Sequence, residues 1–263
     1  MNVELNHRIT GAGNPLILLH GLFGSLENLG GAAQRLQDEW QIHALDLRNH
    51  GKSPHTASMD YAAMADDVVA YMDAQGLDRA ALLGHSMGGK TAMQVALAHP
   101  ERVDHLIVAD ISPVDYKPRH DAILEGMRNL DLSQITSRQQ ADKALNEFVE
   151  ILGVRQFLLK NLVRIPEEAR EHSAGAQFRW RLNLPVIEAC YPALAEAPSA
   201  SGPFEGPTLF LKGADSAYIQ DKHRDQISKL FPKSEVQVIE GTGHWLHAEK
   251  AETFATLCRR FLT

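Results

Sequence analysis

The sequence predicts an α/β fold, with a mostly parallel sheet flanked by helices and interrupted by a helical insertion. Apolar runs alternate with amphipathic stretches of helical period, which is the order of a parallel sheet with right-handed crossovers. One such run continues directly into Gly84-His85-Ser86-Met87-Gly88 and then into a helical pattern. The alternation stops over residues 114–204, where only helical patterns occur. These three observations predict the fold class and its division into two parts.

The core strands are expected at the apolar runs. Residues 3–9 alternate apolar and polar, as an edge strand does. Residues 16–19 form an unbroken apolar run, which is typical of a parallel strand buried on both faces. Similar patterns predict strands at 40–45, 80–83, 103–109, 207–211 and 235–239. Amphipathic patterns predict helices at 29–36, 60–75, 89–99 and 221–230. A closing helix is expected to have apolar residues along one face, namely Ala251, Phe254, Leu257, Cys258 and Phe261.

Residues 114–204 contain no convincing strand pattern. Helical patterns occur instead near residues 121–129, 137–152, 154–162 and 184–195. A helical stretch of this length between two strands of one sheet is much longer than an ordinary connection. We therefore expect a core made of residues 1–113 and 205–263, with residues 114–204 inserted as a helical cap, or lid.

Composition restricts the class of protein. The net charge of −7 and the lack of a basic run argue against a nucleic-acid-binding surface. Cys190 and Cys258 are the only cysteines, and they lie far apart, which favours a reducing compartment over a disulfide framework. No segment has the ~20 consecutive apolar residues of a membrane helix, and the N-terminus lacks an export signal. We expect a cytoplasmic protein without membrane insertion.

The pentapeptide at residues 84–88 has the G-x-S-x-G pattern of a nucleophile elbow. Its glycines are expected where backbone must pass close to the turn without a Cβ atom. The sharp turn would present the Ser86 hydroxyl above the sheet. Placed between a buried strand and a helix, the pattern predicts that Ser86 is a catalytic nucleophile, rather than an incidental serine in a glycine-rich turn.

A serine nucleophile needs a base, and the base needs an anionic partner. His244 follows the last predicted strand in a loop with Gly241 and Gly243, so it is the expected base, with His247 and His85 as its nearest rivals. Two aspartates follow core strands and could orient it, Asp110 and Asp215. Spacing alone leaves both open as the acid.

An oxyanion hole requires two preorganised donors. The backbone N–H groups of Met87, after the nucleophile, and of Leu22, in the loop after residues 16–19, are the expected pair. Phe23 and Trp245 flank these positions and are predicted to contact substrate, and Trp180 is a candidate cap residue with a packing role as its alternative. No histidine pair has metal-binding spacing, so neither a metal nor a cofactor is expected.

The chain resembles α/β-hydrolases over nearly its whole length, and more narrowly the YbfF-like branch of small cytosolic acyl esterases. The matching segments are residues 20–25, 46–53, 84–90, 110–116, 243–245 and 247–250. The resemblance implies hydrolysis of short acyl esters, with acyl-CoA thioesters as a further class, beneath a helical cap. It also favours Asp110 as the acid, because this branch does not require an acid at the position of Asp215. Ser216 beside Asp215 is expected to hydrogen-bond within the site or to be an ordinary loop serine.

Three other functions remain as alternatives. A serine-triad C–C bond hydrolase and a cofactor-free perhydrolase would use the same catalytic residues. A ligand-binding receptor or scaffold on this fold would need none of them together, so the complete set argues against it. Enzymes with a carboxylate nucleophile are excluded by Ser86. The expected partner is a small acyl ester.

Overall fold

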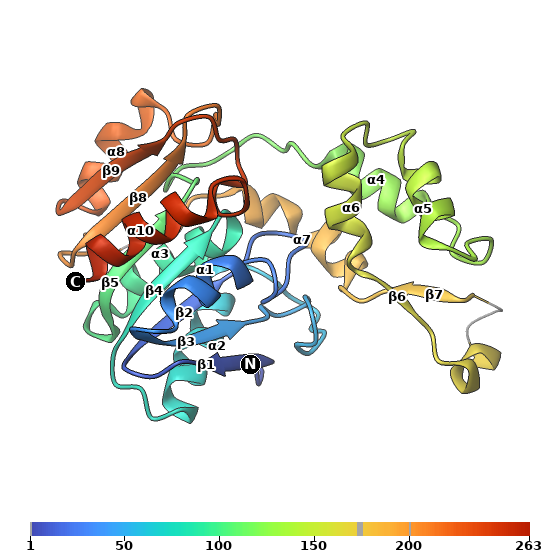
Figure 1. Ribbon diagram of the computed structural model, residues 1–263, viewed down its shortest axis with the longest axis horizontal. Helices are drawn as coiled ribbons and strands as arrows, with labels where there is room; N and C mark the ends of the chain where they lie inside the picture. The colour runs from blue at the N-terminus through green and yellow to red at the C-terminus, as the bar shows by residue number, and fades with distance from the viewer. Residues whose placement is uncertain (1, 173–175, 200) are drawn as a thin grey trace.

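The computed structural model describes residues 2–172, 176–199 and 201–263. A seven-stranded sheet forms its centre, in the order β1-β3-β2-β4-β5-β8-β9 (Figure 1). The first strand, β1, runs antiparallel to β3, and the other neighbours are parallel. The strands are β1 (His7–Thr10), β2 (Asn14–Leu19), β3 (Trp40–Leu45), β4 (Ala80–His85), β5 (Val103–Ala109), β8 (Thr208–Gly213) and β9 (Ser234–Ile239).

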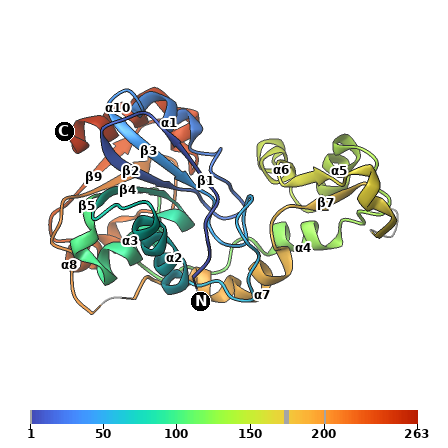
Figure 2. The same ribbon diagram turned by 90° about the horizontal axis from the view of Figure 1, so that it is seen from below.

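Helices cover both faces of this sheet, as Figure 2 shows. One face packs against α1 (Gly30–Leu36) and α10 (Ala251–Leu262). The other packs against α2 (Tyr61–Ala74), α3 (Met87–Ala98) and α8 (Arg224–Leu230). Strand β2 explains the unbroken apolar runs, because Leu16 and Leu18 enter the first layer while Ile17 and Leu19 enter the second. The predicted fold class is confirmed.

Several predicted boundaries shift; the helix predicted over residues 137–152, for example, spans only Arg138–Leu145. The edge strand was expected over residues 3–9, but β1 spans His7–Thr10. Leu5 is nevertheless buried in the core, and the Val3 N–H donates to Asp67 Oδ1 over 2.9 Å. The segment before β1 therefore alternates because it packs against α2, without pairing to a strand. Helix α3 begins at Met87, directly after Ser86 and earlier than the pattern predicted.

The chain between β5 and β8 forms most of a second lobe, at the right of Figure 1. It contains α4 (Asp121–Asn129), α5 (Arg138–Leu145), α6 (Leu152–Leu159), β6 (Leu162–Arg164), the 3₁₀ helix η2 (Glu167–His172), β7 (Phe178–Trp180) and α7 (Leu184–Ala195). We call residues 114–204 the insertion. Among the helices that the structure describes, none combines the length and apolar character required to cross a bilayer.

The expectation that the insertion contains no strand was wrong. Strands β6 and β7 pair antiparallel, with Leu162 opposite Trp180 and Arg164 opposite Phe178. Three residues are too few to display a period of two, so no pattern marks either strand. Their stability comes from packing, because Leu162 and Phe178 are buried in a small cluster with Leu145 and other residues of the insertion.

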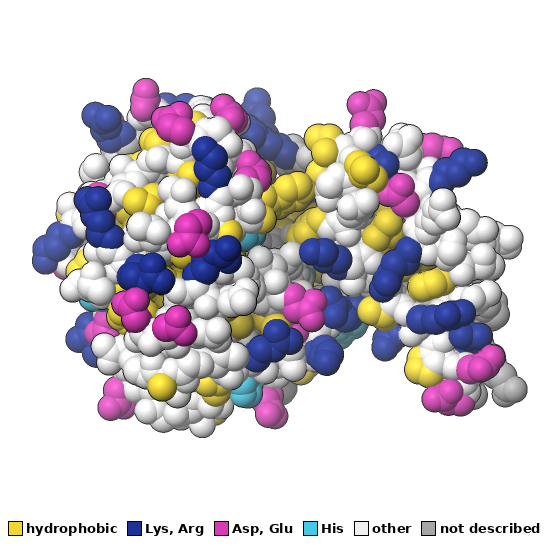
Figure 3. All heavy atoms as spheres, viewed as in Figure 1, with side chains coloured by type: hydrophobic (Ala, Val, Ile, Leu, Met, Phe, Trp, Pro, Cys, Tyr) yellow, Lys and Arg dark blue, Asp and Glu magenta, His cyan; other side chains and the backbone are white. Residues whose placement is uncertain are grey.

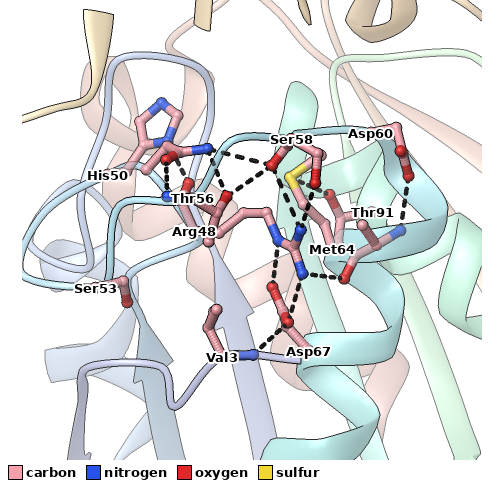
Figure 4. Close-up of polar contacts among 12 residues, drawn as sticks. Val3, Arg48, His50, Ser53, Thr56, Ser58, Asp60, Met64, Asp67 and Thr91 are labelled. Atoms are coloured by element: carbon pink, nitrogen blue, oxygen red, sulfur yellow. Dashed lines mark hydrogen bonds and ion pairs between the residues drawn. The ribbon is translucent and has the colours of Figure 1, made fainter. Parts of the chain in front are cut away.

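A buried ion pair anchors the loop after β3, as Figure 4 shows. Arg48 donates from Nε to Asp67 Oδ2 over 2.6 Å and from Nη2 to Asp67 Oδ1 over 2.7 Å, and both side chains are buried. Arg48 also donates to the Ala63 carbonyl of α2 over 3.1 Å. Because a buried charge requires such a partner, the pair holds this loop on α2. The same loop carries His50, which accepts from the Phe23 N–H beside the site described next.

Candidate active site

Ser86 occupies the turn between β4 and α3, with φ 54° and ψ −119°. A positive φ is strained for a residue with a side chain and persists only where the surroundings enforce it. Here the Ser86 N–H donates to the Ala109 carbonyl of β5 over 3.0 Å, and its carbonyl accepts from the Lys90 N–H over 3.0 Å. These bonds hold the sharp strand-to-helix turn that the sequence pattern predicted.

Close backbone approach explains the two glycines around Ser86. A Cβ atom on Gly84 would lie 2.1 Å from the Gly88 carbonyl oxygen. A Cβ atom on Gly88 would lie 2.2 Å from the carbonyl oxygen of Leu19 in β2. Neither contact can be relieved by turning a side chain, because the obstructing atoms are backbone. Both positions therefore require glycine for space and not for an unusual φ.

Asp110 follows β5 and is fully buried, also with φ 54°. Its Oδ2 accepts from His244 Nδ1 over 2.7 Å, and its Oδ1 accepts from the Gly213 N–H over 3.1 Å. The Ser216 hydroxyl donates to the same Oδ2. A neutral imidazole that donates from Nδ1 keeps Nε2 as an acceptor. His244 is thus held in the tautomer that can take a proton from a hydroxyl.

Asp215, the other candidate acid, is exposed. Its backbone N–H donates to the Thr242 carbonyl over 2.9 Å. His244 donates its hydrogen bond to Asp110, while Asp215 belongs to the surface of the loop after β8. The next residue, Ser216, donates a hydrogen bond to the Asp110 carboxylate, which is one of the two roles expected for it.

Three histidine rings that line the site lie together. His85 Nε2 donates to the His244 carbonyl over 2.8 Å, and the His85 ring lies 4.7 Å from that of His244 and 4.3 Å from that of His247. Burial lowers the pKa of His85 well below its ordinary value and lowers the pKa of His247 to about 4. Both rivals are therefore neutral, and the imidazole bonded to a carboxylate is that of His244.

Two further buried histidines shape the loop after β2. The Phe23 N–H donates to His50 Nε2 over 3.1 Å, and the Leu47 N–H donates to His20 Nε2 over 3.0 Å. Both rings act as acceptors at Nε2, so both are neutral; burial lowers the pKa of His20 and lowers that of His50 to about 3. Phe23 is held at φ 60°, next to Leu22.

Leu22 and Met87, the predicted oxyanion donors, both line a cavity that Ser86 also lines. Two cavities of unequal size open beside Ser86. Leu22 and Ser86 line both of them, and Met87 lines the smaller one. Met87 is the first residue of α3, and the first N–H groups of a helix have no partner within that helix. Leu22 and Met87 therefore both border the space beside Ser86.

The larger cavity, of about 400 Å³, lies between the core and the insertion. Ser86, His244, Phe23 and Trp245 contribute to its core side. Figure 3 shows apolar side chains facing each other across the groove between the two lobes. On the insertion side, its apolar wall consists of Ile123, Val154, Phe157 and Leu158.

The smaller cavity, of about 50 Å³, opens beside the same serine. Its lining includes Tyr61, Met87, Ile111, Tyr116, Tyr191, Leu194 and Tyr218, with the exposed Lys117 and Arg119 at its edge. Lys90 also lines it, buried, with its ammonium 4.9 Å from the centre of the Tyr116 ring and donating to the Ala195 carbonyl over 3.1 Å. Burial lowers the pKa of Lys90 to about 8.

Sequence reasoning missed two residues beside the base. The Tyr218 ring stacks on His244 at 4.2 Å and 31°, and His120 lines both cavities while its Nδ1 bonds to the Tyr191 hydroxyl over 2.7 Å. Neither lies in a recognisable motif, so no local signal marks them. Trp180 has the alternative packing role, since its Nε1 donates to the Met127 carbonyl over 3.1 Å within the insertion. Among the described residues, no three His, Cys, Asp or Glu side chains converge as metal ligands would.

Comparison with known proteins assigns the class. The model of the α/β hydrolase fold family matches residues 14–251, so the chain belongs to this family. Esterase YbfF of Escherichia coli (strain K12) is 39% identical over 266 residues, covering 99% of both chains. The sn-1-specific diacylglycerol lipase ABHD11 of Mus musculus is 38% identical over 255 residues, covering 94% of this chain and 80% of that protein.

A solved structure gives the same result. A marine microorganism esterase superposes with a TM-score of 0.93 at 38% identity, covering 99% of this chain and 100% of its own. The resemblance to YbfF-like esterases is confirmed. The chain is an enzyme of the esterase and lipase type, a carboxylic ester hydrolase.

Proposed function

We propose that the protein hydrolyses carboxylic esters through a covalent acyl-enzyme, with Ser86 as nucleophile, His244 as base and Asp110 as acid. The observation that supports this most directly is the 2.7 Å bond from His244 Nδ1 to Asp110 Oδ2, beside a cavity that His244 shares with Ser86. The nucleophile, the acid and the base follow one another along the chain in the order expected for this fold.

The reaction proceeds in two halves. His244 Nε2 takes the hydroxyl proton of Ser86 as Oγ attacks the ester carbonyl, and the developing oxyanion accepts hydrogen bonds from the N–H groups of Leu22 and Met87. His244 then gives the proton to the leaving oxygen, and the alcohol departs. Water, deprotonated by the same histidine, attacks the acyl-enzyme; the acid is released and the proton returns to Ser86.

Asp110 supports both halves electrostatically. A buried carboxylate beside the ring stabilises the imidazolium that forms in each transition state. Gly213 and Ser216 donate to Asp110, which keeps its oxygens oriented. Asp215 is exposed, so solvent and salt weaken whatever field it exerts on His244.

The insertion, residues 114–204, acts in this proposal as a cap over a core of residues 1–113 and 205–263. It supplies the apolar wall opposite Trp245 in the larger cavity, where Phe157 lies 5.6 Å from the Trp245 ring. Substrates of the proposed enzyme are small acyl esters, with acyl thioesters as a second class. A C–C bond hydrolase or perhydrolase would use the same residues, but the esterase and lipase names of the relatives favour ester cleavage.

A cytoplasmic location is part of the same proposal. Cys190 and Cys258 are both free thiols, and Cys258 is buried, where burial raises the pKa of its thiol. Two unpaired cysteines are typical of proteins in a reducing compartment.

Covalent labelling tests the mechanism. A fluorophosphonate should add one phosphonyl group to the intact protein, and peptide mass spectrometry should place it on Ser86. The matched control Ser133→Ala, at an exposed turn of the insertion, should label as the parent protein does. Labelling of folded Ser86→Ala at the parent rate would refute the assignment of the nucleophile.

A further inference from the structure

Ser86 lies at the junction of two cavities of unequal size, about 400 Å³ and about 50 Å³. We infer that the smaller cavity holds the acyl group and the larger one holds the leaving group, so the enzyme selects short acyl chains on bulky apolar alcohols or thiols. This inference rests on the proposed acyl-enzyme mechanism and adds to it an orientation of the ester.

The position of the base determines the orientation. The departing oxygen receives its proton from His244, so the leaving group must lie on the side of Ser86 that His244 faces. His244 lines the larger cavity, together with its neighbours Trp245 and His247. The smaller cavity is lined by Met87, Tyr61 and Tyr218 among others, and His244 is not among its lining residues. The acyl chain stays on Ser86 after the alcohol departs. It is therefore directed into the smaller cavity.

The smaller cavity limits the acyl chain because its walls are braced. The Tyr61 hydroxyl donates to the Leu194 carbonyl over 2.7 Å. The Tyr191 hydroxyl accepts from the N–H groups of Arg119 over 2.9 Å and His120 over 3.1 Å. Buried hydrogen bonds of this kind are costly to break, so the walls do not move apart easily. On a scale where one water needs about 10–15 Å³, the space accepts an acyl group of about two to four carbons.

The larger cavity suits an apolar leaving group. Ile123, Val154, Phe157 and Leu158 of the insertion provide continuous apolar surface opposite Trp245. Its volume falls within the roughly 300–1,000 Å³ of pockets that bury drug-sized molecules. Gly153 lies at its exposed edge, and a Cβ atom there would meet nothing within 4 Å. The leaving group can therefore be much larger than the acyl group.

Two ester series measured by kcat/KM test the orientation. With a fixed naphthyl leaving group, kcat/KM should fall about 10-fold or more between butanoyl and hexanoyl esters, within the range of about 10–200-fold that one misfitting group produces. With a fixed acetyl group, kcat/KM should rise from methyl to naphthyl esters after correction for the pKa of the leaving alcohol.

Leu194→Ala should widen the smaller cavity and raise the hexanoyl-to-acetyl ratio of kcat/KM by about 10-fold. Leu230→Ala is the matched control, because Leu194 and Leu230 are 7% and 8% exposed and Leu230, in α8, is remote from both cavities. It removes the same atoms from the same core and should leave that ratio unchanged. Ile111→Val, a smaller truncation in the same cavity, gives a second reading if Leu194→Ala does not fold.

Gly153→Phe should fill part of the larger cavity and lower kcat/KM for naphthyl esters relative to methyl esters, with little change in the acyl-length ratio. Gly202→Phe is its control, at another glycine where a Cβ atom would meet nothing within 4 Å. The opposite result, in which Leu194→Ala changes leaving-group preference and Gly153→Phe changes acyl preference, would overturn the orientation. If folded protein cleaves no ester in either series and Ser86 is unlabelled, the proposed function itself fails.

Discussion

The carboxyl edge of the sheet and the insertion differ in how their backbone is held. Among the residues that the structure describes, four non-glycine residues have positive φ, namely Phe23, Asn49, Ser86 and Asp110, and each follows one of the strands β2, β3, β4 and β5. Within the described part of the insertion, no non-glycine residue has a positive φ. Such conformations cost about 1–3 kcal/mol each. The strain is concentrated where the proposed mechanism places the reacting groups, while in the same proposal the insertion supplies only a wall.

The two regions are nevertheless connected at the strained residues. Asn161 of the insertion donates from Nδ2 to the Phe23 carbonyl over 2.7 Å. The Asn183 N–H, also of the insertion, donates to the Asn49 carbonyl over 2.9 Å. The insertion therefore helps to hold two of the four strained positions of the core. This difference predicts large activity losses at the sheet edge and smaller ones in the insertion.

Ser86→Ala should have the largest effect. Removing the nucleophile of a serine hydrolase lowers kcat by about 10⁶-fold, because the covalent route is lost. Ester hydrolysis should be measured on purified protein whose circular dichroism and thermal unfolding match those of the parent. Turnover near the parent value would contradict the mechanism and the view that the sheet edge carries the chemistry.

The aspartates should differ by orders of magnitude. Asp110→Asn should lower kcat by about 10⁴-fold, because the amide imposes the wrong tautomer on His244. Asp215→Asn, the matched substitution at an exposed position, should retain most of the activity. Measuring kcat for both variants tests which aspartate orients His244. The reverse ranking would assign the acid to the loop after β8.

His85 should act as a positioning residue for the base. His85→Leu removes the 2.8 Å bond to the His244 carbonyl and should lower kcat by about 10–100-fold with a much smaller change in KM, because misplaced catalytic groups act on the chemical step. His85→Gln, which can still donate from its amide, should recover part of this loss. Equal losses in both variants, with KM raised, would indicate a packing role instead.

Asn161→Ala should produce a smaller effect that tests the connection between the regions. The loss of its bond to the Phe23 carbonyl should destabilise the protein by about 1–3 kcal/mol, because a buried acceptor loses its donor. We expect kcat to fall no more than about 10-fold. Urea unfolding and ester hydrolysis measure the two quantities, with exposed Asn129→Ala as control. A loss as large as that of Asp110→Asn would remove the distinction between core and insertion.

The last prediction concerns stability in acid. Burial lowers the pKa of His50 to about 3 and of His247 to about 4, so both stay neutral in the folded protein below pH 6.5, where the unfolded chain binds protons. The free energy of unfolding should therefore have its full value above pH 6.5 and should fall as the pH is lowered from 6.5 to 4. His247→Phe should flatten this decline, and His99→Phe, at a less buried histidine, should not. If the free energy of unfolding of His247→Phe falls with pH in parallel with that of the parent, His247 is not a source of the decline.

The sequence by itself determined the features that depend on short stretches of chain. Strand and helix periods, and the turn glycines around Ser86, arise from neighbouring residues, so the parallel sheet and the strand–serine–helix turn could be predicted. The long helical stretch between two strands likewise predicted the insertion. Residues that follow different parallel strands converge at one edge, so Ser86, Asp110 and His244 could be nominated together before any geometry was known.

Only the tertiary structure decided the features that depend on residues far apart in the chain. The carboxylate beside His244 is that of Asp110, 134 residues away. Asp215 follows a core strand equally well, but its side chain is exposed and its backbone N–H bonds to the Thr242 carbonyl of another loop. Strands β6 and β7 are too short for a local pattern and are stabilised by packing. The unequal cavities beside Ser86 exist because Tyr61 and Tyr191, from separate regions, pack around one serine. Spacing along the chain does not encode such contacts, because they arise from how whole elements pack.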